Sequence, residues 1–198
     1  MSLGRRLARV MTDVAVRWPR LWPLYRVLMR KQFDAIAPQW DTMRSAESFA
    51  PFNAALGAVA PPPERVLDVG TGTGEGVLAI LAHFPDVEVV GVDLAGQMLE
   101  RARAKVPAAR FEQADASALP FGAASFDLVT HANMIPFFDE VARVLRPGGH
   151  ALFAWSVGDQ TPIYVAPERL RDELARRGFS DFADFAAGSG TALLARKE

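Results

Sequence analysis

The stretch that decides the fold is "VLDVGTGTGEGV", residues 66–77. An apolar run that ends in an acid leads into a loop with glycines at Gly70, Gly72, Gly74 and Gly76. A glycine-rich turn between the carboxyl end of a strand and a helix brings bare backbone and the helix N-terminus against a ligand. The pattern predicts a cofactor-binding loop at the edge of a sheet, while the same glycines also suit a tight turn that binds nothing.

The spacing of this loop indicates which kind of cofactor it suits. A dinucleotide fingerprint has a small residue at position 75, where this chain has Glu75. The third glycine comes one residue early, which gives G-x-G-x-G, and a carboxylate there would lie close to a pyrophosphate. The loop therefore favours a ligand without phosphates.

From residue 64 onward, short β-rich runs alternate with helical patterns, as in "VEVVGVD" (87–93) followed by 95–105. This rhythm is typical of parallel βα units, and nearly all-apolar strands are expected where helices cover both faces of the sheet. Two further candidate strands flank "GSG" (188–190) and predict a closing antiparallel hairpin. We expect an α/β fold: a three-layer sandwich around a mostly parallel seven-stranded sheet.

Residues 1–63 are expected to form a helical extension, or lid, ahead of a sheet domain at 64–198. The first helix is predicted to be amphipathic, because its apolar residues recur every three or four positions: Leu3, Leu7, Val10, Val14 and Trp18. Residues 1–31 carry eight basic side chains and one acidic one, a net charge of +7, so the remainder carries -8 of the overall -1. This basic segment predicts either simple packing over the active site or contact with an anionic membrane or an acidic substrate. No nucleic acid partner is expected, since no basic stripe continues through the sheet domain.

The composition limits the chemistry and the compartment. There is no cysteine, which excludes disulfides, thiolate metal sites and cysteine nucleophiles and is consistent with a reducing compartment. Arginines, Pro19 and Pro23 interrupt the apolar run that a secretion signal requires, and no window approaches the roughly 18 apolar residues that cross a bilayer. We expect a cytoplasmic protein.

Acids close the second and third predicted strands. Asp93 lies about twenty residues beyond the loop, where a carboxylate can accept both hydroxyls of a ribose; it can equally cap the helix that starts near Ala95. Asp115 ends the third strand. Because parallel strands end at one edge of the sheet, these acids should converge on one nucleoside site.

Four motifs together resemble the class I, seven-strand S-adenosylmethionine-dependent methyltransferases, which have a Rossmann-like fold. They are "VLDVGTGTG", "VVGVDLAGQMLERARAK", "FEQADASALPFGAASFDLV" and "EVARVLRPGGHALFAW", in the family's order and near its spacing. "LPFGAASFDLV" and "RVLRPGG" look most like the small-molecule branch, which includes quinone and lipid methyltransferases. "FDAIAPQWDTM" (33–43) is similar to that branch's lead-in, with Trp40 where a tyrosine is common.

The resemblance implies S-adenosylmethionine as cofactor and a small, partly apolar methyl acceptor. It also implies a role for residues that follow the first four strands. These are Asp68, Gly70, Thr71, Gly72 and Gly74 at the methionine part, Asp93 at the ribose, Leu94 and Met98 beside the adenine, Asp115 and Ala116 at its amino edge, and His131 at the amino-acid end.

Methyl transfer can proceed by alignment of the reactants alone, and a base is needed only if the acceptor must lose a proton. His131 is the leading candidate, although a histidine at a strand end is often a packed residue. His83, at a predicted helix C-terminus, and His150, after a turn, are weaker ones. Asn133 and Asp159 are too few to predict a metal site, and none is expected. "NMIPF" (133–137) only partly resembles the signature of amine-directed methyltransferases.

Two rival functions stay open at this point. The first is a NAD-dependent oxidoreductase, against which the chain lacks a Tyr-x-x-x-Lys pair, because Tyr164 is followed four residues later by Glu168. The second is a partner protein that binds the cofactor without turnover. Cofactor calorimetry and acceptor assays distinguish them.

Overall fold

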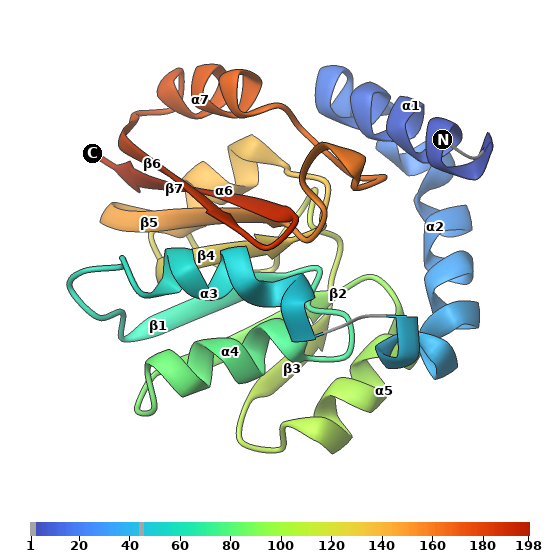
Figure 1. Ribbon diagram of the computed structural model, residues 1–198, viewed down its shortest axis with the longest axis horizontal. Helices are drawn as coiled ribbons and strands as arrows, with labels where there is room; N and C mark the ends of the chain where they lie inside the picture. Colours follow the sequence, from blue (N-terminus) through green and yellow to red (C-terminus); the bar gives the residue numbers. More distant parts are fainter. Residues whose placement is uncertain (1–2, 44–45) are drawn as a thin grey trace.

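The computed structural model describes residues 3–43 and 46–198, and its centre is one sheet of seven strands (Figure 1). The order across the sheet is β3-β2-β1-β4-β5-β7-β6. The pairs among β1 to β5 are all parallel, whereas β7 lies antiparallel between β5 and β6. The predicted mostly parallel seven-stranded sheet with an antiparallel hairpin is confirmed.

The elements follow the predicted alternation along the chain. The strands are β1 (Arg65–Val69), β2 (Glu88–Asp93), β3 (Arg110–Gln113), β4 (Phe126–Ala132), β5 (Leu145–Trp155), β6 (Phe179–Ala187) and β7 (Gly190–Lys197). The α-helices are α1 (Leu3–Arg17), α2 (Trp22–Ile36), α3 (Ala50–Leu56), α4 (Glu75–His83), α5 (Gly96–Lys105), α6 (Phe138–Val144) and α7 (Pro167–Ala175). Short 3₁₀ turns link them at Pro19–Leu21, Ala37–Gln39, Asp41–Met43, Ala46–Phe49 and Gly158–Gln160.

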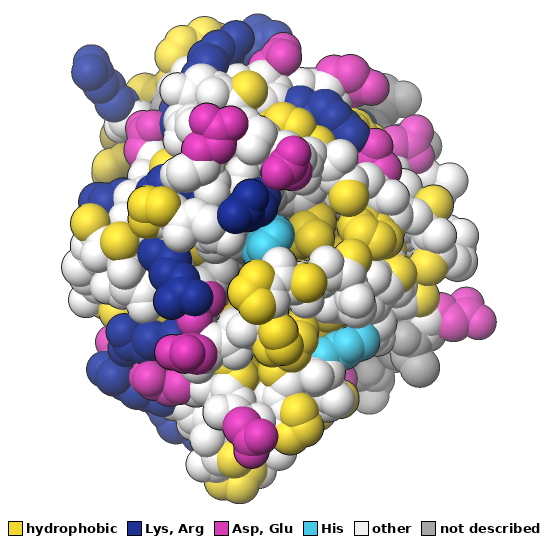
Figure 2. Space-filling view, turned by 90° about the vertical axis from the view of Figure 1, so that its left-hand side faces the viewer, with side chains coloured by type: hydrophobic (Ala, Val, Ile, Leu, Met, Phe, Trp, Pro, Cys, Tyr) yellow, Lys and Arg dark blue, Asp and Glu magenta, His cyan; other side chains and the backbone are white. Residues whose placement is uncertain are grey.

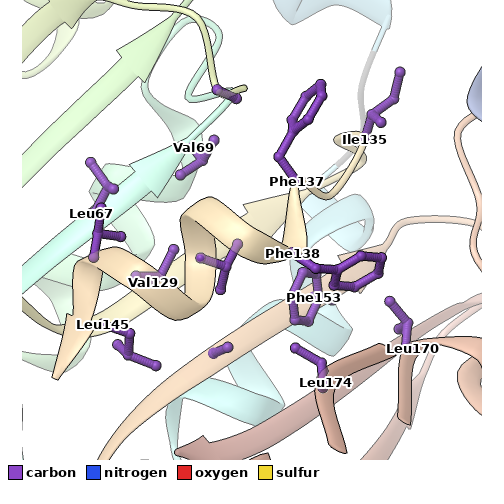
Figure 3. Close-up of a cluster of buried hydrophobic side chains, with 14 of the residues drawn as sticks. Leu67, Val69, Val129, Ile135, Phe137, Phe138, Leu145, Phe153, Leu170 and Leu174 are labelled. Carbon is purple, nitrogen blue, oxygen red and sulfur yellow. The ribbon is translucent and has the colours of Figure 1, made fainter. Parts of the chain in front are cut away.

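Consecutive strand residues enter two different cores, one on each face of the sheet. Val66 packs in one cluster and Leu67 in the other, and Leu128 and Val129 divide in the same way. All four side chains are fully buried, as expected for a strand covered on both faces. Figure 3 shows one of these clusters, where Phe153 of β5 and Phe138 of α6 lie close to Leu170 and Leu174 of α7.

The helices complete the three layers. Side chains of α3, α4 and α5 share the cluster of Val66 and Leu128, and those of α6 and α7 share the cluster of Leu67 and Val129. α1 and α2 lie at one edge of the sandwich (Figure 1). The third helix of the expected extension therefore packs as part of the sandwich. α1 and α2 lie at its edge, with Ala15, Val16 and Trp22 in the cluster of Leu67 and Val129.

β5 begins earlier than the sequence pattern predicts. "LRPGG" reads as a turn before a strand that starts near Gly149, yet pairing with β4 already begins at Leu145. The register shifts between Phe126 and Leu128, and Gly148 takes the left-handed φ of +79° that this irregularity requires. The turn residues thus form a bulge inside one long strand.

Across the described parts of the chain, no helix combines the length and the apolar character needed to span a bilayer.

Candidate functional site

A cavity of about 660 Å³ opens at the carboxyl ends of β1, β2 and β4. Its volume lies within the usual range for small-molecule sites, and its position is the one where open α/β sheets bind ligands. One side is formed by residues 70–73 of the glycine loop, and the other by side chains of α1, α2 and the turns that follow them. The cavity therefore lies between the sheet and the N-terminal helices.

The glycine loop is held by backbone contacts to the neighbouring strand. The N–H groups of Gly70 and Thr71 donate to the carbonyl of Val92 at 2.8 and 2.9 Å. Gly70 takes a φ of +71°, and a Cβ there would also lie 2.7 Å from the Met134 sulfur. Glycine is thus required at position 70 both by the backbone conformation and by a packed side chain.

Gly76 is needed for a different reason. It lies in the first turn of α4, and a Cβ would come within 2.9 Å of an oxygen of Asp68. Asp68 is buried, and its Oδ1 accepts a hydrogen bond of 2.7 Å from the Thr130 hydroxyl on β4. The missing side chain at position 76 leaves room for a buried carboxylate that lines the cavity.

Asp93 joins β2, the glycine loop and α5. Its Oδ2 accepts from the Gly72 N–H and its Oδ1 from the Ala95 N–H, both at 2.9 Å. Burial raises the pKa of this carboxyl to about 6, against the effect of these backbone donors. A third backbone contact, from Leu94, acts on the same carboxylate, whose side chain lines the cavity. Asp93 is not the N-cap of α5 that the sequence allowed: the N-cap is Ala95, and Asp93 accepts from the N–H of that residue ahead of the helix. The ribose role stays a prediction.

Asp115 is held by the N-terminal helix α2. Its Oδ1 accepts from the Trp22 indole N–H at 2.8 Å and its Oδ2 from Arg26 at 2.8 Å. Ser117 adds backbone and hydroxyl donors at 2.9 and 2.8 Å. These donors hold the pKa of Asp115 below its usual range despite partial burial. The side chain lies outside the described cavity lining, whereas its neighbours Ala114 and Ala116 lie within it.

A second connection joins the helical segment to the glycine loop. Lys105 at the end of α5 lies 2.6 Å from Glu75 and 2.8 Å from Asp41, and the Thr73 hydroxyl also donates to Asp41. Glu75, which argued against a pyrophosphate, is therefore paired with a cation while it lines the cavity. Sequence reasoning missed Lys105 and Asp41, because their partners are distant along the chain.

Within the glycine loop, the Thr71 hydroxyl is a buried polar group that lacks a hydrogen-bond partner among the described residues. Thr71 lines the cavity, while its hydroxyl is buried beside Gly91 of β2. Burial of a hydroxyl without a partner is costly, so such a group suggests an absent ligand.

The charge of the cavity wall has one sign. Asp68, Glu75 and Asp93 line it, and no lysine, arginine or histidine is found among the lining residues that the structure describes. A dinucleotide would bring two phosphates to this wall, whereas a sulfonium would bring a positive charge. The wall therefore suits the sulfonium and disfavours the oxidoreductase reading.

His131 lies in the core behind the cavity. Its ring stacks on Phe153 with 4.8 Å between centroids, and it is 2% exposed. Its Nδ1 has no partner among the described residues, and burial lowers its pKa to about 3. The cavity is lined instead by the next residues, Ala132, Asn133 and Met134. The geometry does not favour His131 as a base, and its predicted contact with the cofactor stays a prediction.

The structure brings most of the predicted site residues to one cavity. Those that line it are Asp68, Gly70, Thr71, Gly72, Asp93, Leu94, Met98 and Ala116. Gly74, Asp115 and His131 are not part of the described lining. Gly74, with a φ of +88°, packs instead against Ala102 and Val106 of α5 and its cap. No three metal-binding side chains cluster in the described part of the chain.

Comparison with known proteins agrees with this geometry. Residues 66–149 match the model of a methyltransferase domain family. The demethylmenaquinone methyltransferase of Deinococcus radiodurans is 39% identical over 61% of this chain and 57% of its own length. The ubiquinone/menaquinone biosynthesis C-methyltransferase of Geotalea daltonii is 33% identical over 72% of this chain and 67% of its own length.

The chain belongs to the class I S-adenosylmethionine-dependent methyltransferases. It spans about three fifths of the length of the curated relatives it matches. A chain in the complex between the Haloferax volcanii Trm112 methyltransferase activator and a putative methyltransferase has the same fold. The TM-score is 0.69 at 19% identity, over 83% of this chain and 96% of that one.

Members of this methyltransferase family take the methyl group from S-adenosylmethionine, and the residues present fit that cofactor. The unpartnered Thr71 hydroxyl, the Asp93 carboxylate at the cavity wall and the absence of basic side chains from the described lining all suit an adenosyl sulfonium. The resemblance at the family level is therefore confirmed, while the role of each residue stays a prediction.

Proposed function

We propose that this chain transfers a methyl group from S-adenosylmethionine to a small, partly apolar acceptor. The observation that carries the proposal is the cavity itself, where three carboxylates on the strand and loop side face an apolar wall from the N-terminal helices. One side suits a cation with hydroxyl groups, and the other suits an uncharged ring or chain.

On the strand side, the cofactor supplies an electrophilic methyl group when bound. Asp93 would accept the ribose hydroxyls, Thr71 would donate to or accept from the amino-acid end, and Leu94 and Met98 would pack on the adenine. The bonds from Gly72 and Ala95 already fix the Asp93 carboxylate, so little reorganisation accompanies binding. Such fixed placement is how alignment alone lowers the barrier to transfer.

On the helical side, the wall is formed mainly by apolar and aromatic side chains. They include Met11, Trp22, Met29, Phe33, Trp40, Ile135 and Ile163. Methionines adapt to the shape of an apolar ligand, and the aromatic rings offer flat contact surfaces. Since the two curated relatives are named for menaquinone methylation, a demethylated naphthoquinol is the acceptor class we propose.

The segment ahead of α3 would serve as the lid over this acceptor. The Arg9 guanidinium on α1 donates to the backbone carbonyls of Asp159 and Thr161 in the loop after β5, and α2 is held to Asp115. Two ends of the helical pair are thus fastened to opposite sides of the cavity, which would exclude water from the methyl group. The basic N-terminal helices also remain candidates for peripheral membrane contact.

A transfer assay with radiolabelled S-adenosylmethionine tests the function. We expect labelled methyl on a demethylated naphthoquinol with a short side chain, and much less transfer by Asp93→Ala. Calorimetry on the same preparation separates the rivals. Cofactor binding without transfer to any acceptor would identify a silent binding protein, and binding of NAD in preference to S-adenosylmethionine would identify an oxidoreductase.

A further inference from the structure

Helix α2 is apolar on two opposite faces. Its inner face carries Trp22, Met29 and Phe33, which line the cavity. Leu24, Val27 and Leu28 lie on the opposite side of the helix, because residues three and four apart share a face. A helix with one apolar face can bury that face against its own protein. The second apolar face of α2 can be buried only against another molecule.

The outer face of α2, defined here as Leu21, Leu24, Val27 and Leu28, is open to solvent. The exposed fractions of these side chains are 40, 80, 49 and 63%. Trp18, whose carbonyl accepts from the Leu21 N–H, is 56% exposed beside them. α2 lies at the edge of the molecule with no other labelled element on its outer side (Figure 1). Elsewhere among the described residues, large apolar side chains this exposed are limited to Val10, Leu78 and Val157.

The surroundings of this face are basic. Arg17, Arg20, Arg30 and Lys31 are all exposed around it, and residues 1–31 carry the net charge of +7. The side of the molecule away from α2 differs, since basic, acidic and apolar side chains are interspersed there (Figure 2). The outer face of α2 thus combines an apolar stripe with a mainly basic rim. The two acids of α1 and α2 are already engaged, since Asp13 pairs with Arg169 and Asp34 accepts from the Gln97 N–H.

We propose that the outer face of α2 binds the surface of an anionic lipid bilayer. Leucines and valines at this spacing would enter the boundary between headgroups and acyl chains, with Trp18 at headgroup level. The arginines and Lys31 would meet the negative headgroups, each adding to the attraction near such a surface. The helix would lie in the interface and not cross it.

Charge argues against a second copy of this chain as the occupant. In a twofold symmetric dimer through this face, Arg20, Arg30 and Lys31 would meet the same residues of the other copy. Like charges across an interface disfavour such a pairing. An anionic surface instead complements the apolar stripe and the basic rim together.

Membrane binding through the outer face of α2 would also bring the enzyme to a lipid-soluble acceptor. This link between membrane and acceptor rests on the proposed function. With the outer face of α2 in the headgroup layer, its inner face is one helix diameter away and still lines the cavity. An acceptor with a long apolar chain could then keep that chain in the bilayer while its ring reaches the cavity. The same helix would separate the lipid from the site of transfer.

Vesicle flotation tests the membrane contact without reference to catalysis. The full chain is mixed with vesicles of pure phosphatidylcholine or of phosphatidylcholine with phosphatidylglycerol, at low and high salt. We expect binding to the anionic vesicles, weakened by salt. The double variant Leu24→Ser/Leu28→Ser should partition at least tenfold more weakly onto these vesicles. Arg20→Gln and Lys31→Gln should each weaken partitioning about fivefold, because each removes one positive charge. Leu78→Ser on α4, an exposed leucine elsewhere, is the matched control and should bind as the wild type does.

Three results would overturn the membrane proposal. One is no binding to anionic vesicles by a wild-type chain that binds S-adenosylhomocysteine. Another is equal weakening by Leu78→Ser and Leu24→Ser/Leu28→Ser. The third is a lipid-free dimer, seen by light scattering, that Leu24→Ser/Leu28→Ser converts to monomer. Circular dichroism confirms folding of the variants. Because transfer to a short-chain acceptor does not require lipid, the proposed function can succeed or fail separately.

Discussion

The indole N–H of Trp22 donates to Oδ1 of Asp115 at 2.8 Å, which ties α2 to the loop after β3. The same ring packs edge-on against Phe137 at 5.3 Å and against Tyr25 at 5.1 Å. One side chain thus joins the cover of the cavity to the rim where an adenine is expected. The hydrogen bond between Trp22 and Asp115 therefore holds α2 in place and also fixes the loop beside the expected adenine site.

Trp22→Phe should loosen this connection while it keeps an aromatic ring in the core. We expect the free energy of unfolding to fall by about 1 to 2 kcal/mol, because a hydrogen bond to a charged group is lost. Limited proteolysis should cut more readily before residue 43. Trp18→Phe, at a tryptophan that is 56% exposed, is the control. Equal effects of the two substitutions would contradict a specific role for the Trp22 contact.

Two glycines in the first turns of helices provide a matched pair. Gly76→Ala places a Cβ 2.9 Å from an Asp68 oxygen, whereas Gly96→Ala meets nothing nearer than 3.8 Å. We expect Gly76→Ala to weaken S-adenosylhomocysteine binding at least tenfold, and Gly96→Ala to leave it unchanged with slightly higher stability. Calorimetry and thermal unfolding measure both. Wild-type affinity in Gly76→Ala would show that the position of Asp68 does not matter for binding.

Thr71→Val should affect binding and stability differently. The hydroxyl has no described partner, so its removal should leave the free energy of unfolding equal or higher, while cofactor affinity falls by about 0.5 to 1.5 kcal/mol. Thr130→Val is the contrasting variant. It loses the 2.7 Å bond to Asp68 and should destabilise the fold by about 1.5 to 3 kcal/mol. A Thr71→Val protein with unaltered affinity would remove this hydroxyl from the cofactor site.

Burial of His131 predicts a specific dependence of stability on pH. Its pKa is about 3 in the folded protein and near 6.5 when unfolded, so between these values the unfolded chain binds more protons. Stability from this residue is complete above pH 6.5 and falls by about 1.4 kcal/mol for each pH unit below it. Between pH 7.5 and 5, the free energy of unfolding should fall by about 2 kcal/mol less in His131→Gln than in the wild type. His83→Gln, at an exposed histidine, is the control and should behave as the wild type does. Urea unfolding at both pH values measures this, and identical slopes in all three proteins would contradict the burial of His131.

The fold was predictable because its signals are local and repeated. Val66 and Leu67, or Leu128 and Val129, are adjacent apolar residues that enter opposite cores, and such pairs identify strands covered on both faces. The glycine loop and Asp93 could be found for the same reason, since the loop directly follows β1 and Asp93 is the last residue of β2. The earlier start of β5 was missed because "RPGG" forms a bulge where it reads as a turn.

The connections across the cavity could not be predicted in this way. Trp22 and Asp115 lie 93 positions apart, and a tryptophan in an amphipathic helix gives no indication of its partner. Lys105 likewise reads as a cation that suits a helix C-terminus, although it joins Glu75 and Asp41. For His131, position in a strand buried on both faces does not reveal that the cavity wall begins one residue later.

Asp93 is the residue on which cofactor binding is expected to depend most. Asp93→Ala should weaken S-adenosylhomocysteine binding by about 1.5 to 3 kcal/mol, while Glu88→Ala, at an acid 55% exposed at the other end of β2, should not. Because the pKa of Asp93 is about 6 and ribose hydroxyls donate to its ionised form, wild-type affinity should also decline as pH falls below 6.

Calorimetric titration of S-adenosylhomocysteine into the wild type, Asp93→Ala and Glu88→Ala at pH 7.5 and 5.5 tests this most directly, with NAD as the competing ligand. We predict one site in the wild type, a loss of roughly tenfold to a hundredfold in Asp93→Ala, wild-type affinity in Glu88→Ala and no binding of NAD. Equal affinity of folded Asp93→Ala and the wild type for S-adenosylhomocysteine would contradict the role of Asp93 in cofactor binding. So would a wild-type protein that binds NAD and not S-adenosylhomocysteine.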